Sequence, residues 1–192
     1  MAKTKKRGIT GDCTWTLDTD GLLTISGDGA MGNYTSSSSL SWGTNIKSVV
    51  IENGVTTIGS HAFDGCSGLT SVTIPNSVTT ISGYAFYNCT GLTSVTIPES
   101  VTSIGYSAFA QCTSLTSVTI PNSVTTISYW AFAQCTSLMS VNIPNSVTTI
   151  GYWSFGYGEN CYTQIDGFTI YCDKDSVAEN YAKERGINYV TD

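Results

Sequence analysis

The sequence predicts a solenoid, a right-handed coil with a parallel β-sheet on one side and short helical or 3₁₀ turns on the other. Four cysteines lie 23 residues apart, each inside the same motif, AFxxCxxLxSVxI. They are Cys66, Cys89, Cys112 and Cys135. A period of this length indicates one supersecondary unit stacked on copies of itself, because a single unit is too small to bury its own apolar face.

The residues before the repeats are predicted to form an arm and a cap. Residues 1–10 are expected to be a disordered arm or a cloning scar, since half of the eight basic residues lie there. Over 11–45 we predict an N-terminal β cap, because apolar residues alternate around Asp20 and Gly21, a pair favoured in hairpin turns. The hairpin would lay four apolar side chains over the first coil, those of Trp15, Leu17, Leu23 and Ile25. The serine-rich run at 35–39 is predicted to be a flexible loop.

A short strand recurs in every repeat. Aligned on LxxVxI, the repeats begin at Ile46, Leu69, Leu92, Leu115 and Leu138, and a sixth begins at Ile165 after a four-residue insertion. In SVTI at 71–74 the alternation predicts that Val72 and Ile74 point into the core and the polar side chains point outward. The outer face of the stacked sheet would then carry Val50, Thr73, Thr96, Thr119, Asn142 and Thr169.

A proline and a turn follow these strands. Every proline stands directly after a strand, where a residue without an N–H donor ends the ladder. The four are Pro75, Pro98, Pro121 and Pro144. Val78 and Ile81 then return to the core, and the threonines between them face water or a second short ladder. The i, i+3 spacing of Phe86 and Cys89 places both on one side of a helical turn.

The six repeat strands are predicted within 46–170, and a C-terminal cap within 171–192. Ser176 and Glu179 fit a capping box at the start of a helix, and Gly186 fits its end. Residues 187–190 are predicted to close the cap as a last strand.

The repeats resemble those of the BspA-type leucine-rich-repeat family, whose units read roughly LxxVxIPxxVxxIGxxAFxxC. The resemblance covers 46–155, and the flanks look like family capping segments. It departs from leucine-rich repeats in general where an interior Asn is replaced by Ser77, Ser100, Ser123 or Ser146. The hydrogen bonds of that turn must therefore be satisfied differently. The resemblance implies a curved solenoid used in adhesion or protein recognition by surface proteins of bacteria and some protists, with no catalytic residues to transfer.

Charge excludes two classes of partner. The formal net charge is −6, and no Lys or Arg lies between Ser48 and Ile170. Nucleic-acid binding depends on Lys and Arg that neutralise phosphates, so we expect no nucleic-acid partner. The same argument weighs against anionic membrane surfaces, and no segment is long enough to span a bilayer.

The basic first residues have no apolar stretch behind them, so we expect no complete secretory signal. Either the protein stays in the cytoplasm or a leader has been replaced. The family resemblance favours an extracellular or cell-surface location.

The cysteine ladder is a candidate for chemistry that its geometry argues against. Parallel strands lie about 4.8 Å apart, so the cysteines form a line, whereas tetrahedral zinc needs four ligands converging on one point. Their parallel Cβ atoms, roughly 5 Å apart, are also too distant for disulfides. We therefore predict buried, unreactive thiols and no metal or cofactor. Cys161 and Cys172 flank the last strand and could pair in an oxidising compartment.

The sequence offers little material for catalysis. His61 is the only histidine, and the acids of the repeat body form no repeated pair. His61 aligns with Tyr84, Ser107, Trp130 and Trp153 of later repeats, which marks a variable surface position rather than a catalytic base. We therefore predict no catalytic residues and no enzyme.

The repeats vary most at the two residues before the Ala-Phe pair. The segment 71–82 recurs unchanged at 117–128, whereas this pair reads SH, GY, YS, YW and YW in successive repeats. Tyr and Trp give rigid, amphipathic contact area and are favoured in binding surfaces. We predict a partner-binding row, the aromatic stripe, opposite the sheet or along its flank; the alternative is that its rings only shield the solenoid. The aromatic stripe comprises Tyr84, Tyr87, Tyr106, Tyr129, Trp130, Tyr152 and Trp153.

The sheet face is the competing site. Its small, uncharged ladder suits a regular partner or simply a soluble β surface, which is the interpretation we favour. The candidate residues there are Thr73, Thr96, Thr119 and Asn142.

Three functions follow from these observations. The first is a non-enzymatic scaffold that recognises a protein partner, of the adhesion or surface-recognition type. The second is a glycan-binding module in which sugar rings stack on the aromatic stripe. The third is a structural spacer or an engineered consensus repeat scaffold, which the near-identity of the repeats permits.

Overall fold

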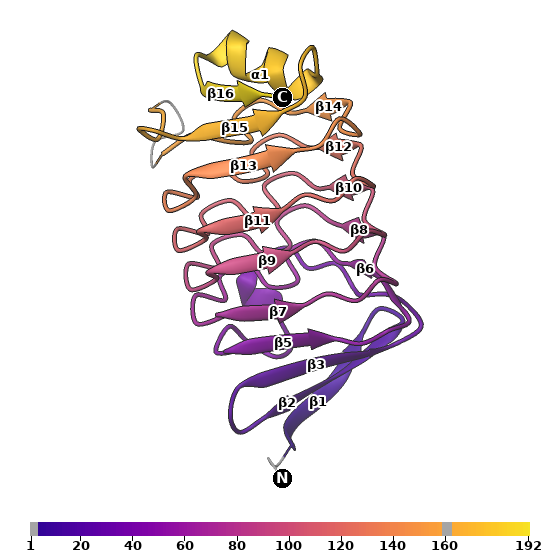
Figure 1. Ribbon diagram of the computed structural model, residues 1–192. Coiled ribbons are helices and arrows are strands. Elements are labelled where there is room, and N and C mark those ends of the chain that lie inside the picture. The colour runs from indigo at the N-terminus through magenta and orange to yellow at the C-terminus, as the bar shows by residue number, and fades with distance from the viewer. Residues whose placement is uncertain (1–3, 159–162) are drawn as a thin grey trace.

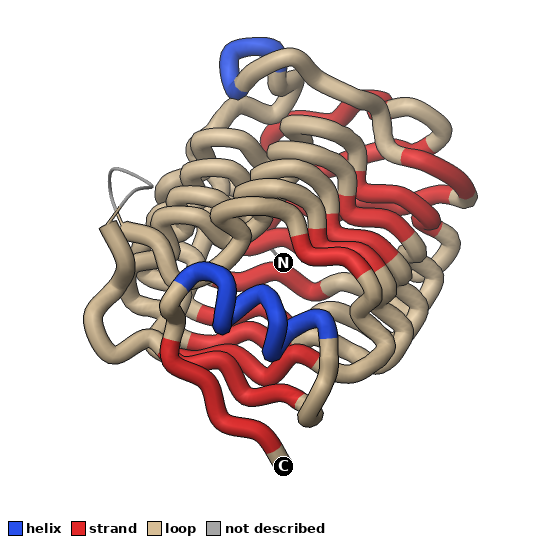
Figure 2. Tube along the Cα trace, turned by 90° about the horizontal axis from the view of Figure 1, so that it is seen from above, coloured by secondary structure: helices blue, strands red, loops and turns tan. Residues whose placement is uncertain are grey.

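The chain folds as a solenoid of about seven turns, in which each middle turn gives one strand to each of two parallel ladders (Figure 1). The computed structural model describes residues 4–158 and 163–192. Viewed along the coil, the two ladders form two sides and tight turns form the third (Figure 2). The predicted fold class is confirmed.

The first ladder contains the strands predicted from the LxxVxI pattern. It comprises β3 (Leu22–Gly27), β5 (Ser48–Ile51), β7 (Ser71–Thr73), β9 (Ser94–Thr96), β11 (Ser117–Thr119), β13 (Ser140–Ile143) and β15 (Thr169–Cys172). Four neighbouring pairs of this series are hydrogen-bonded in parallel, β3–β5, β5–β7, β9–β11 and β13–β15, and Val95 of β9 lies opposite Val118 of β11. β9 lies beside β7, and β13 beside β11, without a hydrogen-bonded ladder. The polar residues of these strands face outward as predicted, because a strand turns alternate side chains to opposite faces.

The register of the last repeat strand corrects the sequence alignment. The alignment placed Thr169 opposite Asn142, but Thr169 lies opposite Ser140 and Ile170 opposite Val141. The shift arises because Phe168, aligned with a strand valine, lies before β15 in a turn that its N–H closes on the Ile165 carbonyl. A shift of two residues keeps every side chain on its predicted face.

The second ladder is a continuous six-stranded sheet of very short strands. It comprises β4 (Gly29–Ala30), β6 (Val55–Ile58), β8 (Thr80–Ile81), β10 (Ser103–Ile104), β12 (Thr126–Ile127) and β14 (Thr149–Ile150). Serine hydroxyls fasten the coils beside it. Ser77 Oγ donates to the Val55 carbonyl at 2.7 Å, and Ser100 Oγ to the Val78 carbonyl at 2.5 Å. Serine thus bonds between coils where other leucine-rich repeats carry an interior Asn.

The third side consists of tight turns around a ladder of phenylalanine rings. The turns are closed by i→i+3 bonds such as Cys89 N–H to the Phe86 carbonyl, the 3₁₀ pattern, while Phe86 N–H donates to the Ala108 carbonyl of the next coil. All the ladder rings are buried, with neighbouring centroids 5.0 to 5.2 Å apart. The ladder comprises Phe63, Phe86, Phe109, Phe132 and Phe155.

The N-terminal cap is the predicted hairpin with one further strand. β2 (Cys13–Asp18) pairs antiparallel with β3, which lies parallel to β5, and the four predicted apolar residues are buried. β1 (Thr4–Thr10) pairs antiparallel with β2. The expectation of a disordered arm over 1–10 is therefore wrong for 4–10, because the free edge of β2 supplies backbone partners that the polar sequence does not reveal.

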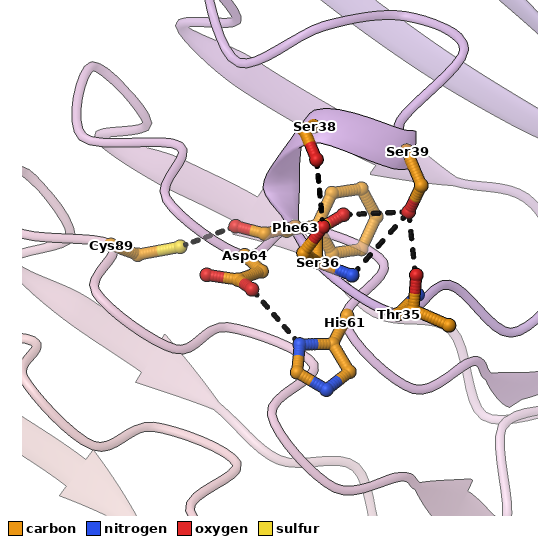
Figure 3. A network of polar contacts seen from close by, with 8 residues as sticks. All are labelled: Thr35, Ser36, Ser38, Ser39, His61, Phe63, Asp64 and Cys89. Atoms are coloured by element: carbon orange, nitrogen blue, oxygen red, sulfur yellow. Dashed lines mark hydrogen bonds and ion pairs between the residues drawn. The ribbon is translucent and has the colours of Figure 1, made fainter.

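The serine-rich run is hydrogen-bonded rather than a flexible loop. It forms a short 3₁₀ helix, η1 (Ser37–Ser39). Ser39 Oγ donates to the Ser36 carbonyl at 2.7 Å and accepts from the backbone N–H groups of Thr35 and Ser36 (Figure 3). Serine hydroxyls can hydrogen-bond the nearby backbone in this way, so a serine-rich composition does not by itself make a segment flexible.

The C-terminal cap is the predicted helix and strand. In α1 (Val177–Arg185), Ser176 Oγ accepts from Glu179 N–H at 3.1 Å, and Gly186 ends the helix with a φ of 64°. β16 (Asn188–Thr191) pairs in parallel with β15, and α1 lies across the end of the coil (Figure 2). Within the described ranges, no helix is both long and apolar enough to cross a membrane.

Candidate functional site

The aromatic stripe begins where the chain leaves the second ladder and enters the turns. In four repeats the second residue of the variable pair has a left-handed backbone: φ is 58° at Tyr84, 50° at Ser107, 63° at Trp130 and 58° at Trp153. His61 of the first repeat shares the conformation, with a φ of 55°. The sharp bend into the third side requires it. Tyr, Trp, Ser and His all adopt this conformation at a steric cost.

The first residue of the variable pair gives the stripe its exposed surface. Tyr106, Tyr129 and Tyr152 are 42%, 49% and 53% exposed, while the other members are half-buried. These three tyrosines therefore project into solvent, and Trp130 and Trp153 are less exposed than they are. Burial of these tryptophans would favour the spacer hypothesis and exposure a binding role, and they are neither buried nor fully exposed.

Rings of the stripe touch from coil to coil without forming a regular stack. Trp130 and Trp153 meet edge to face with centroids 5.7 Å apart, and the rings of Tyr129 and Tyr152 lie 5.8 Å apart at an interplanar angle of 31°. Tyr84 lies 5.2 Å from Tyr106. Rings of the stripe therefore shield one another and at the same time remain partly exposed to solvent.

The C-terminal end of the stripe carries a cation that the repeat pattern did not reveal. The Arg185 guanidinium lies 4.6 Å from the ring centroid of Tyr152 and 4.3 Å from that of Tyr181. Such distances are typical of cation–π contacts. The only sequence signal was a basic residue in the last turn of the predicted cap helix.

The other end of the stripe is closed by His61. Its Nδ1 lies 2.9 Å from Asp64 Oδ2 (Figure 3). Its ring stacks on that of Tyr84, with centroids 4.5 Å apart. The histidine is thus held between a carboxylate of its own turn and a ring of the next coil. This agrees with a surface position in the stripe.

The sheet face lies on a different side of the coil from the stripe. Thr73, Thr96, Thr119 and Asn142 are all exposed on the first ladder, as predicted. Their side chains are small and uncharged, and neighbouring strands present nearly the same residues. From β7 to β13 the face offers no large side chain to anchor a partner, and Tyr171 of β15, which lies opposite Asn142 and is 46% exposed, is the large side chain at its C-terminal end.

The cysteine ladder is buried and bonded to the core backbone. Cys89, Cys112 and Cys135 donate their Sγ–H groups to the carbonyls of Phe63, Phe86 and Phe109, the first of which Figure 3 shows. Burial raises the pKa of both Cys66 and Cys112 to about 12. These thiols fit the structural role predicted for them.

Other cysteines add no site among the described residues. Residues 4–158 and 163–192 contain no group of three or more His, Cys, Asp or Glu side chains that could hold a metal ion. The pairing suggested for Cys161 and Cys172 involves a residue outside these ranges.

A family model of the BspA-type leucine-rich-repeat region matches residues 34–162 with six copies, which is more than half of the chain. No curated protein matches the chain.

Several solved bacterial structures share the fold. The leucine-rich-repeat protein TpLRR of T. pallidum is 22% identical over 96% of this chain and 98% of its own, with a TM-score of 0.59. A leucine-rich-repeat protein from Bacteroides ovatus is 24% identical over 89% of this chain and 46% of its own, with a TM-score of 0.63. A leucine-rich cell surface protein from Faecalibacterium prausnitzii is 27% identical over 90% of this chain and 56% of its own, with a TM-score of 0.51. The chain spans about half the length of the last two.

Proposed function

The chain belongs to the BspA-type leucine-rich-repeat family, and from that premise we propose that it is a non-enzymatic scaffold that recognises a protein partner through the aromatic stripe. Proteins of such repeat families commonly serve in protein interaction or at surfaces. The similarity to a protein named for its cell-surface location supports a surface location, and the adhesive role is part of the proposal.

The observation that carries this proposal is the contrast between a constant framework and a variable, outward-facing row of tyrosines. Tyr106, Tyr129 and Tyr152 occupy the same position in successive coils and are the most exposed members of the stripe. Beside two of them stand Trp130 and Trp153, held in a left-handed conformation that few large residues adopt.

The extent and charge of the stripe favour a protein partner. Tyr84 and Tyr152 are three repeats apart, so the stripe runs about 15 Å along the coil at the usual strand spacing. It carries no charged side chain between His61 and Arg185, so aromatic contact and tyrosine hydroxyls dominate recognition. Tyr, Trp and Arg are the residues that most often anchor protein interfaces.

The test is a titration of tryptophan fluorescence, with acrylamide quenching, against a panel of extracellular-matrix proteins and glycans. Trp15 and Trp42 are only 4% and 2% exposed, so the quencher reports mainly on Trp130 and Trp153. A stripe variant, Trp130→Asn, removes an anchor at a left-handed position that Asn tolerates. A sheet-face variant, Thr119→Glu, serves as its matched control.

Saturable protection by a protein that is lost in Trp130→Asn and kept in Thr119→Glu supports the proposal. The opposite pattern would move the site to the sheet face. Protection by glycans alone would establish the lectin-like alternative. Quenching that no member of the panel alters, in either variant or the parent, would favour the spacer.

A further inference from the structure

We infer that the aromatic stripe ends in a cleft that selects partners by a carboxylate placed next to an apolar side chain. This inference rests on the proposed protein recognition and names the chemistry of the partner segment. Arg185 would bind the carboxylate, and the apolar wall beside it would receive the neighbouring side chain.

The cleft lies between the last coil and the C-terminal cap. It encloses about 230 Å³. The residues lining it are Ile150, Tyr152, Val177, Asn180, Tyr181, Glu184 and Arg185. Tyr152 belongs to both the stripe and the cleft, so a segment lying along the stripe reaches the cleft without leaving the surface.

Arg185 is preorganised there as an anion-binding group. Its side chain is only 12% exposed, and the rings of Tyr152 and Tyr181 lie at 4.6 and 4.3 Å from it. Among the described residues, the hydrogen bonds of the guanidinium come from Nη1, which donates one to the Tyr181 carbonyl and one to the Glu184 carboxylate. The Nε and Nη2 donors therefore remain for a ligand, and an arginine fork of this kind matches a carboxylate.

The charge around the stripe makes this arginine distinctive. No Lys or Arg lies between Ser48 and Ile170, so Arg185 is the cation at the end of a long uncharged surface. The nearby Lys183 is already paired with Glu179 at 2.8 Å. Arg185 is the cation that contacts the aromatic stripe, through the ring of Tyr152.

Glu184 is the acid that competes for Arg185. Its carboxylate lies 3.1 Å from Nη1, but its side chain is 70% exposed. Ion pairs at such exposed positions contribute little, so a ligand carboxylate held against the aromatic wall can displace or join it. Ile150, Tyr152 and Val177 provide the apolar surface that an isolated carboxylate does not use.

The experiment uses N-acetyl-L-phenylalanine and its primary amide as probes for the ¹⁵N-labelled full chain. We expect the carboxylate probe to shift the NMR signals of Tyr152, Val177 and Arg185 in a saturable way. The amide probe, equal in shape, should bind about tenfold more weakly, because a charge-assisted bond to arginine is lost. Arg185→Gln should remove the preference for the carboxylate.

Lys183→Gln is the matched control, since it removes one positive charge from the same helix away from the cleft. It should keep the preference, whereas Glu184→Gln should tighten binding of the carboxylate. Arg185→Lys keeps the positive charge but removes the planar guanidinium fork. For each variant, the NMR signals of α1 show whether the C-terminal cap is folded.

Equal binding of the two probes, no shift at the cleft up to the solubility of either, or a preference that survives Arg185→Gln in a folded cap would overturn this inference. Those results would leave protein recognition by the stripe standing, because the fluorescence titration tests it separately. A normal probe preference in a chain that no protein of the panel protects from quenching would separate the two in the other direction, since the cleft would then stand without protein recognition by the stripe.

Discussion

The phenylalanine ladder and the aromatic stripe are two aromatic rows in the same turns, and the variable pair lies two and three residues before each phenylalanine. Phe86, Phe109 and Phe132 stack nearly parallel, at interplanar angles of 4° and 5°, and are fully enclosed. Rings of the stripe meet at angles between 31° and 70° and remain partly in water. Aromatic character alone therefore does not decide whether a ring becomes framework or surface.

The difference lies in enclosure as well as in repetition. In the ladder the same buried residue recurs in every coil, so each ring meets its neighbour in nearly the same way. In the stripe the residues change between His, Tyr, Ser and Trp, and even the identical, partly exposed Trp130 and Trp153 meet edge to face, so no parallel stacking propagates. Stability in a solenoid is nearly a sum of such neighbour terms, which leaves the variable row free to change without loss of the fold.

Both rows end on the C-terminal cap, where they meet different parts of Tyr181. The Tyr181 hydroxyl accepts a hydrogen bond from Phe155 N–H at 3.1 Å and closes the ladder. On its other side, the ring of Tyr181 contacts Arg185 at the end of the stripe. One residue thus couples the end of the framework to the end of the proposed binding surface.

The comparison predicts its largest effect for Phe109→Ala in the middle of the ladder. Removing a buried ring that has neighbours on both sides leaves a cavity, and the free energy of unfolding should fall by about 3–5 kcal/mol. Urea denaturation measures it. A loss below about 1 kcal/mol would show that Phe109 does not carry the core.

The matched change in the stripe is Tyr106→Ala, three residues earlier in the same coil. Tyr106 is 42% exposed, so its removal should cost less than about 1 kcal/mol. Similar losses in the two variants would abolish the distinction between framework and stripe.

The second large effect is expected at the buried cysteines, which should be far less reactive than thiols exposed to solvent. Burial raises the pKa of Cys112 from 9.0 to about 12, so its thiolate population at neutral pH falls about a thousandfold. Iodoacetamide should therefore label it only when the chain opens, and labelling should accelerate in parallel with unfolding by urea. Rapid alkylation of the native protein, followed by mass spectrometry, would mean that the ladder opens locally.

Features that repeat were predictable from the sequence, and features supplied by a neighbour were not. The strands, the turns after each proline and both caps follow from periodic apolar residues and capping signals. β1 was missed because Lys6 and Arg7 carry no apolar alternation, and its pairing comes from β2. The left-handed backbone at Trp130 was missed because that conformation favours Gly and Asn.

The candidate site was predicted only in part for a similar reason. Variation between repeats identified the members of the stripe, since it needs no structure to detect. Arg185 could not be assigned, because it lies outside the repeats and reaches Tyr152 only through the packing of α1 on the last coil. The register of β15 was misaligned by two residues because the insertion before it has no counterpart in other repeats.

A smaller effect is expected at the serines that replace an interior Asn. Ser100 Oγ donates to the Val78 carbonyl, so Ser100→Ala should lower the free energy of unfolding by about 0.5–1.5 kcal/mol. Ser146 Oγ is buried and has no hydrogen-bond partner among the described residues, which makes Ser146→Ala the matched control. Its stability in urea should be unchanged or slightly higher. Equal losses would show that the hydroxyls do not fasten the coils.

The smallest effect concerns the support of the stripe by the cap, and it depends on pH. The hydrogen bond from Lys183, with that from Asp175 N–H, holds the pKa of Glu179 below its usual value of 4.5. A carboxylate of lowered pKa stabilises the fold above its unfolded value, and that contribution is lost as the pH falls through the folded value. NMR signals of Tyr152 and Arg185 should therefore change on acidification before those of the phenylalanine ladder. Glu179→Gln should remove this difference, and a simultaneous change in both rows would mean that the cap and the framework unfold as one unit.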